Sequence, residues 1–303
     1  MFFMKITLKQ LAVFSATARL KGITKAAEEL YITQSAASQS LKELESILGF
    51  QLFNRVGREL QLNKQGEHIL TTATQMLELQ SRLENSLDDP VQGKLVVSAS
   101  VTIGSYVLPK LLAKFVRLYP LVEPKLDISN SEQVIEQLAQ GQAHIGFVEA
   151  PIVHPSLTVT PWCSDYLTIF CSPRHQLAKQ KQLSLAELSE QRWVLREHGS
   201  GTRSVFIAAM QKQGFRIKNT MDLSRQEAIK QAVKADLGLG VLSQRSIEDE
   251  LKQQVFIPLN CSLNLLRQFS IVQAEFYQYN VLVNTFYQFL LNNKPYSRLD
   301  ITK

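Results

Sequence analysis

The spacing of apolar residues changes twice along the chain and divides it into three parts. Up to Leu62 the pattern is that of short amphipathic helices separated by breaks, and residues 64–87 form one long helical stretch. From Pro90 onward, short apolar runs alternate with helical segments, which is typical of an α/β fold. The pattern predicts a helical head over 1–62, a linker helix over 63–89 and a larger body over 90–303.

Three short helices are expected in the head. The first spans residues 8–20, and its predicted core face is formed by Leu8, Leu11, Ala12, Ser15 and Ala18. Thr24 is expected to cap the second helix, which runs to Leu30. After a two-residue turn, Thr33 caps the third helix, which ends at Gly49. A short helix, a tight turn and another helix form a helix-turn-helix.

The third helix has two different faces. Its core face is formed by Ala37, Leu41, Leu44 and Leu48. Its other face carries small hydroxyls and amides, which let a helix approach base edges in the major groove, and a lysine that can meet a phosphate. The residues predicted to contact DNA here are Thr33, Gln34, Ser35, Ser38, Gln39 and Lys42. The alternative is a small helical domain whose polar face is simply solvated.

Residues 50–62 are expected to form a two-stranded wing. Arg55 and Arg58 flank Gly57, and Leu60 and Leu62 alternate after it as they would along a strand. Arginines at such a tip can lie against the DNA backbone or in the minor groove. The head is therefore predicted to be a winged helix-turn-helix.

The long helix has heptad spacing. Its apolar seam is formed by Ile69, Ala73, Met76, Gln80, Leu83 and Leu87. Since the segment is expected to have no core of its own to pack on, a second copy of the chain is the predicted partner, and packing against the body is the alternative. Two heads held at a fixed separation would read two half-sites of one operator.

Charge agrees with a nucleic-acid-binding head. Residues 1–66 hold nine Lys and Arg against five Asp and Glu, which places +4 of the net charge of +6 in the first fifth of the chain. The three cysteines follow no disulfide or zinc spacing, which favours a reducing compartment. With no signal-peptide core and no apolar run of about 20 residues, a soluble, cytoplasmic protein without a membrane partner is expected.

Three stretches of the head together resemble the signature of the LysR-type transcriptional regulators. They are Ala26-Ala27-Glu28-Glu29-Leu30, Thr33-Gln34-Ser35-Ala36-Ala37-Ser38-Gln39, and Leu44-Glu45-x-x-Leu48-Gly49-x-x-Leu52-Phe53-x-Arg55. The resemblance implies an α+β multidomain fold, with a body that is an α/β two-lobed, periplasmic-binding-protein-like (type 2) effector domain. It also implies linker helices that pair antiparallel, dimers that commonly assemble into tetramers, promoter DNA as a partner, and RNA polymerase as a further candidate partner.

The lobes are assigned on the same resemblance, which covers residues 93–292. Lobe I is predicted to comprise 91–161 and 268–303, and lobe II to comprise 162–267, with two strands crossing between them. In such folds a ligand lies at the carboxyl ends of strands and at helix N-termini.

Two segments of the body suit a small anion. Ser100 and Thr102 end the first strand, before a helix expected to continue through Leu108 and Phe115. In the second lobe, a strand at 193–195 leads into Ser200, Gly201, Thr202 and Arg203 at the start of another helix. Hydroxyls and free backbone amides at a helix N-terminus hold oxyanions. A Gly-Ser-Gly-Thr run is by itself more often only a helix entry, but in the family it resembles, the effector contact lies here.

Glu149 follows the strand at 145–148 and is the unexpected member of the predicted site. A carboxylate repels an anion unless it is protonated or screened, and Arg203 is the expected screen. Glu149 therefore suggests a ligand that carries a proton or an amine. The alternative is a surface salt bridge.

The run from Arg196 to Arg203 is similar to that of LysR-type regulators of sulfur assimilation and of carbon-fixation operons. A small oxyanion, such as sulfite or sulfate, is the predicted effector, and no cofactor is expected. A rival is a structural DNA-binding protein with vestigial lobes. An enzyme is not expected, because Ser200 and His198 lack a third orienting group and His144 and His154 lack metal spacing.

Overall fold

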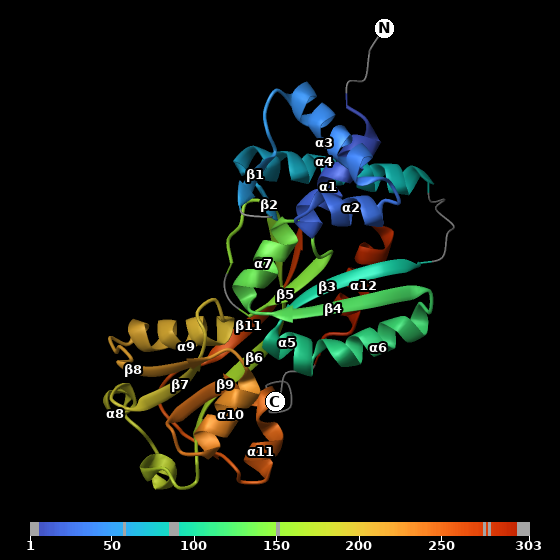
Figure 1. Cartoon of the computed structure of the whole chain (residues 1–303). Helices are drawn as coiled ribbons and strands as arrows, with labels where there is room; N and C mark the ends of the chain where they lie inside the picture. The colour runs from blue at the N-terminus through green and yellow to red at the C-terminus, as the bar shows by residue number, and fades with distance from the viewer. Residues whose placement is uncertain are drawn as a thin grey trace.

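The computed structural model describes residues 6–56, 59–84, 91–149, 152–274, 277 and 280–295. The head comprises α1 (Leu8–Leu20), α2 (Ile23–Glu29), α3 (Gln34–Leu48), β1 (Phe53–Val56), β2 (Glu59–Leu62) and α4 (Lys64–Glu84). It lies at the top of the molecule in Figure 1, with the body below it. The expected order of helix, turn, helix and two-stranded wing is confirmed.

Helix α1 is the centre of the head, because it packs on α2, α3 and α4 at once. The predicted core face was only partly right. Leu11 and Ala18 are buried, but Leu8 is 38% exposed, and the largest buried side chain is Phe14, whose ring meets Phe53 edge-on at 5.6 Å. A helix that is covered on several sides buries more than one stripe, so a single-face pattern underestimates its core.

The caps explain where α2 and α3 begin. Thr33 caps α3 by accepting a hydrogen bond from Ala36 N at 3.2 Å, and Gly49 ends it in the left-handed conformation, both as predicted. The assignment of Thr24 as the cap of α2 was wrong, because extended Gly22 precedes the first residue of α2, Ile23. Thr24 thus lies inside the first helical turn, whereas a capping residue has a non-helical backbone and precedes that turn.

The first half of α4 belongs to the core of the head. Leu70 is 2% and Ala73 1% exposed, and both pack in the cluster that contains Leu11 and Leu44. The expectation that this helix lacks a core to pack on was therefore wrong for its first half. Further along, Met76 is 45% exposed. Leu87 lies outside the described residues, as do all of 85–90, and the side chain of Leu83 is likewise not described.

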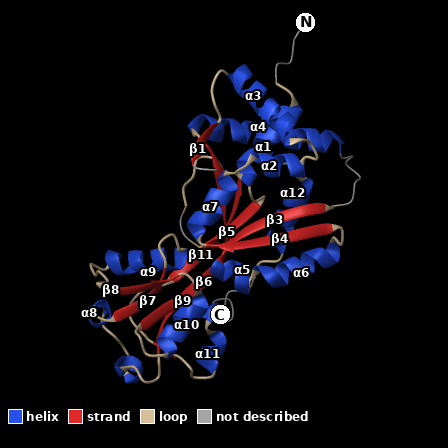
Figure 2. Cartoon of the chain, viewed as in Figure 1, coloured by secondary structure: helices blue, strands red, loops and turns tan. Residues whose placement is uncertain are grey.

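One sheet of nine strands runs through the body, in the order β4-β3-β5-β11-β6-β9-β7-β8, with β10 paired to β6. Its strands are β3 (Gly93–Ser100), β4 (Val122–Ser129), β5 (Ile145–Val148), β6 (Leu157–Cys171), β7 (Arg192–Arg196), β8 (Asn219–Leu223), β9 (Leu239–Ser243), β10 (Ile257–Pro258) and β11 (Leu266–Ala274). The long antiparallel strands β6 and β11 connect two halves, and their register shifts between Phe269 and Ser270. We call the half around β3, β4 and β5 lobe I, and the half around β7, β8 and β9 lobe II (Figure 2).

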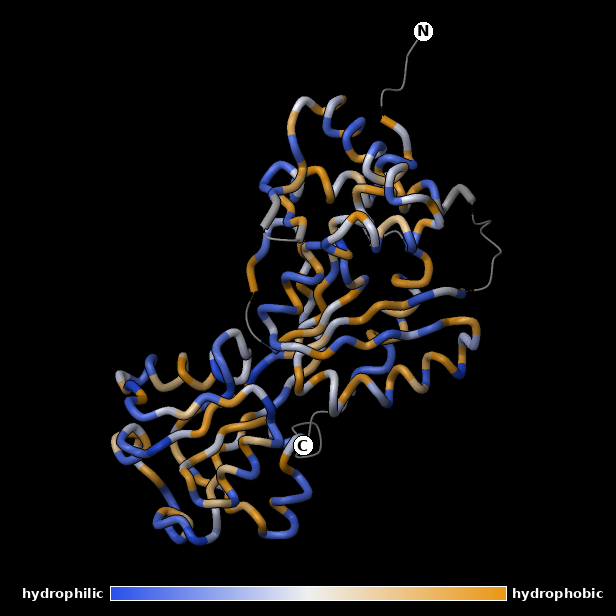
Figure 3. The backbone as a smooth tube through the Cα atoms, in the orientation of Figure 1, coloured by the Kyte–Doolittle hydropathy of each residue, from blue (hydrophilic) through white to orange (hydrophobic). Residues whose placement is uncertain are grey.

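Helices cover the sheet in both lobes. They are α5 (Val101–Tyr106), α6 (Leu108–Leu118), α7 (Ser131–Ala139), α8 (Leu185–Ser189), α9 (Gly201–Lys212), α10 (Gln226–Lys234), α11 (Glu248–Lys252) and α12 (Val281–Asn292), with short 3₁₀ turns at Gln176–Lys179 (η1) and Gln244–Ser246 (η2). Each lobe has its own apolar core, and hydrophobic segments run through both lobes in the trace of Figure 3. The two-lobed α/β architecture is confirmed.

The helix expected after Thr102 is in fact two helices. Helix α5 ends at Tyr106 and α6 begins at Leu108, with Val107 at φ −118° between them. Pro109 follows directly, and because proline has no N–H to donate back, the first helix cannot run through it. Among the described residues, no helix has the length and hydrophobicity needed to cross a membrane.

Candidate functional site

The polar face of α3 is presented to solvent. Gln34, Ser35, Gln39 and Lys42 are exposed and Ser38 is half-buried, while Ala37, Leu41 and Leu44 on the opposite face are at most 5% exposed. Thr33 is exposed too, but its hydroxyl is engaged as the helix cap and also lies 3.1 Å from Ser35 Oγ. The helix can therefore enter a groove while its core face stays packed on α1.

The wing is an antiparallel pair of short strands in which Val56 faces Glu59 and Arg55 faces Leu60. Arg58 and Gly57 lie outside the described residues, and of Arg55 only the position in β1 is described. The DNA contacts predicted for the two arginines stay predictions.

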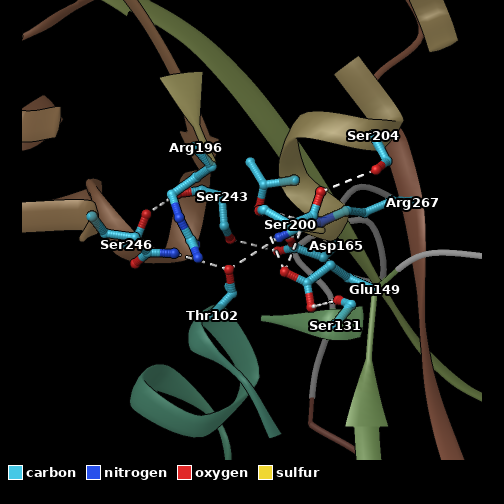
Figure 4. Close-up of polar contacts among 12 residues, drawn as sticks. Thr102, Ser131, Glu149, Asp165, Arg196, Ser200, Ser204, Ser243, Ser246 and Arg267 are labelled. Atoms are coloured by element: carbon cyan, nitrogen blue, oxygen red, sulfur yellow. Dashed lines mark hydrogen bonds and ion pairs between the residues drawn. The ribbon is translucent and has the colours of Figure 1, made fainter. Parts of the chain in front are cut away.

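The body holds a network of charged and hydroxyl side chains between its lobes, centred on Arg267 of β11 (Figure 4). Its Nε donates a hydrogen bond of 2.8 Å to Asp165 Oδ2 on the facing strand β6, and its Nη2 lies 2.8 Å from the same oxygen. Its Nη1 donates a hydrogen bond of 3.0 Å to Thr202 Oγ1. Thr102 Oγ1 lies 3.4 Å from the same guanidinium. Since the side chains of Arg267 and Asp165 are at most 2% exposed, this is a fully buried ion pair.

Four helix starts surround this network. Thr102 is in α5, Ser131 in α7, Thr202 in α9 and Gln226 in α10, and each is buried. Gln226 Nε2 donates to Thr102 Oγ1 at 3.0 Å, which joins lobe II to lobe I. The positive ends of these helix dipoles therefore lie around the network, as they do in anion sites.

Three buried polar atoms at this place have no hydrogen-bond partner: Ser100 Oγ, Ser200 Oγ and Gln226 Oε1. The two serines are 1% and 2% exposed. A buried hydroxyl without a partner is unfavourable by about 1–3 kcal/mol. Groups of this kind at the starts of helices suit a ligand that brings hydrogen-bonding atoms of its own.

Glu149 is buried in this network and is not a surface residue. Its carboxylate lies 3.4 Å from both Arg267 Nη1 and Thr202 Oγ1, and 3.5 Å from Ser131 Oγ. The surface salt bridge that we considered for Glu149 is therefore wrong. The contacts of Glu149 are long for charge-assisted hydrogen bonds. This carboxylate is therefore held less tightly than that of Asp165, which also accepts a hydrogen bond of 2.8 Å from Ser243 Oγ.

Arg203 is not the screen for Glu149. Its guanidinium donates to the backbone oxygen of Arg196 at 2.8 Å and pairs with Asp222 at 2.5 Å. This turns the side chain toward β7 and β8, because the partners of Arg203 lie along those strands. Arg267 takes the expected role.

A second contact between the lobes lies at Gly199, just before the start of α9. Glu132 N donates to Gly199 O at 3.3 Å, and Gly199 has φ +81°. A Cβ there would lie 2.5 Å from Glu132 Oε2 and 3.2 Å from Asn130 Nδ2. The start of α7 therefore rests closely on the loop of lobe II that leads into Ser200.

Sequence reasoning missed Arg267, Asp165 and Gln226. A signal for the first two was present, since both occupy the inward phase of strands in which neighbouring inward residues are apolar, such as Phe269 in β11 and Leu167 in β6. A charge at such a position needs a buried partner. That the partner is Asp165 follows only from the register of β6 against β11.

The described residues contain no group of three His, Cys, Asp or Glu that could hold a metal ion. Burial raises the pKa of Cys163 and of Cys171 to about 12, and both thiols are free. They therefore stay protonated near neutral pH.

Two family profiles match the chain. Residues 8–67 match "Bacterial regulatory helix-turn-helix protein, lysR family", and residues 88–294 match "LysR substrate binding domain". The HTH-type transcriptional regulator YeiE of Escherichia coli K12 is 36% identical over 84% of this chain and 88% of its own. A RuBisCO operon transcriptional regulator of Allochromatium vinosum is 32% identical over 85% and 86%.

A solved structure with this fold contains a ligand. The Synechocystis CcmR regulatory domain in complex with 2-PG is 26% identical, covers 66% of this chain and 97% of its own, and superposes with a TM-score of 0.61.

Proposed function

The chain belongs to the LysR family of bacterial transcriptional regulators, which are not enzymes, and from that premise we propose which ligand it senses and how. The proposed effector is a small oxyanion that carries a proton or another hydrogen-bond donor. It binds between the lobes, at Ser100, Thr102, Ser200, Gly201 and Thr202, with Arg267 behind it. The observation that carries this proposal is the pair of buried hydroxyls without partners, Ser100 and Ser200.

The charges around the site support a protonated ligand. Arg267 contacts Glu149 and Asp165, and Arg245 contacts Asp165 at 3.3 Å, so two cations face two carboxylates. A fully deprotonated dianion would meet no surplus of positive charge and would lie beside Glu149. A ligand with a donor can direct it to that carboxylate and its remaining oxygens to the hydroxyls. Hydrogensulfite fits this description, and sulfate fits it less well.

The proposed mechanism is a shift between two positions of the lobes. The ligand contacts groups of both lobes, so it stabilises the closed arrangement over any in which the lobes separate. Closure changes the angle between paired heads, and with it the bend of the promoter and the access of RNA polymerase. A ligand that bound both arrangements equally would change nothing.

Pairing of two chains is part of this proposal. Met76 and Leu79 of α4 are 45% and 52% exposed, in the part of the helix beyond its packing on the head. Two α4 helices packed along these residues would hold two heads for two half-sites, and pairs could join into tetramers. The reading residues proposed for each head are Thr33, Gln34, Ser35, Ser38, Gln39, Lys42, Arg55 and Arg58.

A thermal-shift and calorimetry panel at pH 7 tests the effector proposal. The panel contains hydrogensulfite, sulfate, bicarbonate and 2-phosphoglycolate, and the proteins are wild type, Ser200→Ala and Ser204→Ala. Ser200→Ala removes an unpartnered buried hydroxyl, so it should stabilise the free protein by about 1 kcal/mol and weaken ligand binding about tenfold. Ser204 is an exposed residue of α9, one turn further on, and its hydroxyl donates to the backbone oxygen of Ser200 at 3.1 Å rather than to any of the unpartnered atoms. Its alanine variant should therefore bind as wild type does.

Two results would overturn the proposal. If no oxyanion of the panel stabilises the wild-type protein, the lobes are not an oxyanion sensor, and the alternative of a structural DNA-binding protein with vestigial lobes gains support. If Ser200→Ala binds the effector as tightly as wild type does, a site exists but lies elsewhere.

A further inference from the structure

Glu43 lies on the reading helix α3 and joins two glutamine side chains. Gln39 Nε2 donates to Glu43 Oε1 at 3.0 Å, one helical turn away, and Gln10 Nε2 of α1 donates to Glu43 Oε2 at 3.3 Å. Each carboxylate oxygen thus accepts one amide. The chain of contacts runs from a residue of the core helix to an exposed residue of the face proposed to read DNA.

Gln10 is a fixed end of this chain. It is 7% exposed, and its Oε1 accepts a hydrogen bond from Thr7 N at 2.9 Å in the capping box of α1. The Gln10 amide therefore uses its oxygen at the cap and its nitrogen at Glu43. Because Gln10 cannot turn without losing the cap, the position of the Glu43 carboxylate is fixed as well.

A carboxylate only accepts hydrogen bonds, so Gln39 must turn its NH₂ toward Glu43. Its Oε1 and its second N–H are then presented outward in one fixed order. Adenine offers an acceptor at N7 and a donor at N6 in the major groove, whereas guanine offers two acceptors, N7 and O6. The fixed amide of Gln39 matches adenine and places its oxygen against O6 of guanine.

We propose that Glu43 is a positioning residue that fixes the amide of Gln39 for adenine and against guanine in each half-site. This inference rests on the proposed role of α3 as the reading helix. The contact with Gln39 does little for the fold, because a hydrogen bond one turn apart stabilises a helix only slightly, and a carboxylate on a DNA-facing helix is repelled by phosphates.

The test is selection of duplexes from a random library by the full chain, with the base frequencies read at every position. The variants are Gln39→Ala, Glu43→Ala and Glu28→Ala. Glu28 is an exposed carboxylate of α2, so its variant controls for the loss of one negative charge. Melting temperatures show that each variant is folded.

In the expected result, wild type and Glu28→Ala select adenine over guanine roughly ten- to hundredfold at one position of each half-site. Gln39→Ala loses that preference. Glu43→Ala keeps the base preference of wild type at every other position, but at the position that depends on Gln39 it selects adenine and guanine with frequencies that differ by no more than about threefold. A folded protein with a purely structural loss would bind more weakly without changing one base position.

Two results overturn the inference. If Glu43→Ala keeps the full adenine preference at the position that depends on Gln39, the carboxylate does not orient the amide. If Gln39→Ala changes no position, or the position that depends on Gln39 prefers another base, then α3 does not read adenine through Gln39 and the inference fails with it. An adenine preference that survives in Glu43→Ala leaves the reading role of α3 intact. A base selection that is unchanged in Gln39→Ala shows that Gln39 takes no part in reading DNA.

Discussion

Replacing Arg267 by methionine would remove the cation that holds the centre of the body together. The arginine donates to Asp165 and Thr202 and lies beside Thr102 and Glu149, and its side chain is 1% exposed. Methionine keeps much of the apolar volume but leaves two buried carboxylates, Asp165 and Glu149, without the cation that contacts both. Removing one partner of a buried ion pair costs about 3–5 kcal/mol, and we expect a loss of unfolding free energy in that range.

Loss of Arg267 should destabilise the Glu149 carboxylate more than that of Asp165. Asp165 keeps Arg245 at 3.3 Å and Ser243 at 2.8 Å, whereas Glu149 keeps only its longer contacts of 3.4–3.5 Å to hydroxyls. Neutralising Glu149 should therefore restore a good part of the unfolding free energy that Arg267→Met loses. We expect the double variant Arg267→Met, Glu149→Gln to recover about 2 kcal/mol relative to Arg267→Met, although Glu149→Gln alone should be mildly destabilising.

Tryptophan fluorescence during urea unfolding measures this loss in each lobe. The chain has two tryptophans, Trp162 in the core of lobe I and Trp193 in that of lobe II. Variants with one tryptophan replaced by phenylalanine therefore report one lobe at a time. Because Arg267 contacts groups from both lobes, both transitions should move to lower urea with an unchanged slope.

A loss below about 1 kcal/mol would refute this reasoning, since an arginine so readily replaced is not compensating buried charge. A loss confined to one lobe would refute the claim that the network joins the two. Failure of Glu149→Gln to relieve Arg267→Met would show that the carboxylate is not what makes the single variant unstable.

Three further predictions follow from single residues. Gly199→Ala should lower oxyanion affinity about tenfold in calorimetry, because its Cβ would lie 2.5 Å from Glu132 Oε2 across the lobe boundary. Unchanged affinity would show that the contact between Gly199 and Glu132 does not favour closure of the lobes. Tyr31→Gly should stabilise the protein by about 1 kcal/mol in thermal unfolding, because Tyr31 has φ +53° and is 96% exposed; a lower melting temperature would contradict this. Burial, assisted by Arg19 and Lys94, lowers the pKa of His144 from 6.5 to about 4. Between these pH values the unfolded chain binds a proton at His144 and the folded chain does not, so stability should fall as pH drops from 6.5 toward 4, by up to about 1.4 kcal/mol per pH unit. The variant His144→Gln should lack this pH dependence of its unfolding free energy.

Features fixed by neighbouring residues were predictable from the sequence. The start of α3 at Thr33, its end at Gly49 and its two faces depend on contacts within one or two turns, and such contacts can be read from spacing. The strand of residues 145–148 was predictable for the same reason, being a short apolar run before a charged residue.

Features that depend on distant pairings were not predictable in this way. Arg267 and Asp165 are 102 positions apart, and only the register of two long strands makes them neighbours. Likewise, the packing of Leu70 on the head depends on the path of α4 after the wing, while heptad spacing placed Ile69 and Ala73 in an intermolecular seam. The assignment of Arg203 to Glu149 failed because Asp222, on a neighbouring strand, is the closer partner.

The most direct test of the central claim follows the bend of DNA while the effector is added. A duplex selected by the wild-type chain carries a fluorophore at each end, and hydrogensulfite is titrated into its complex with the full chain. The account predicts that transfer efficiency changes saturably over the concentrations at which calorimetry detects binding, and that Thr202→Val, which lacks a hydroxyl of the site, needs about tenfold more ligand. Saturated binding with an unchanged bend in the wild-type complex would contradict it.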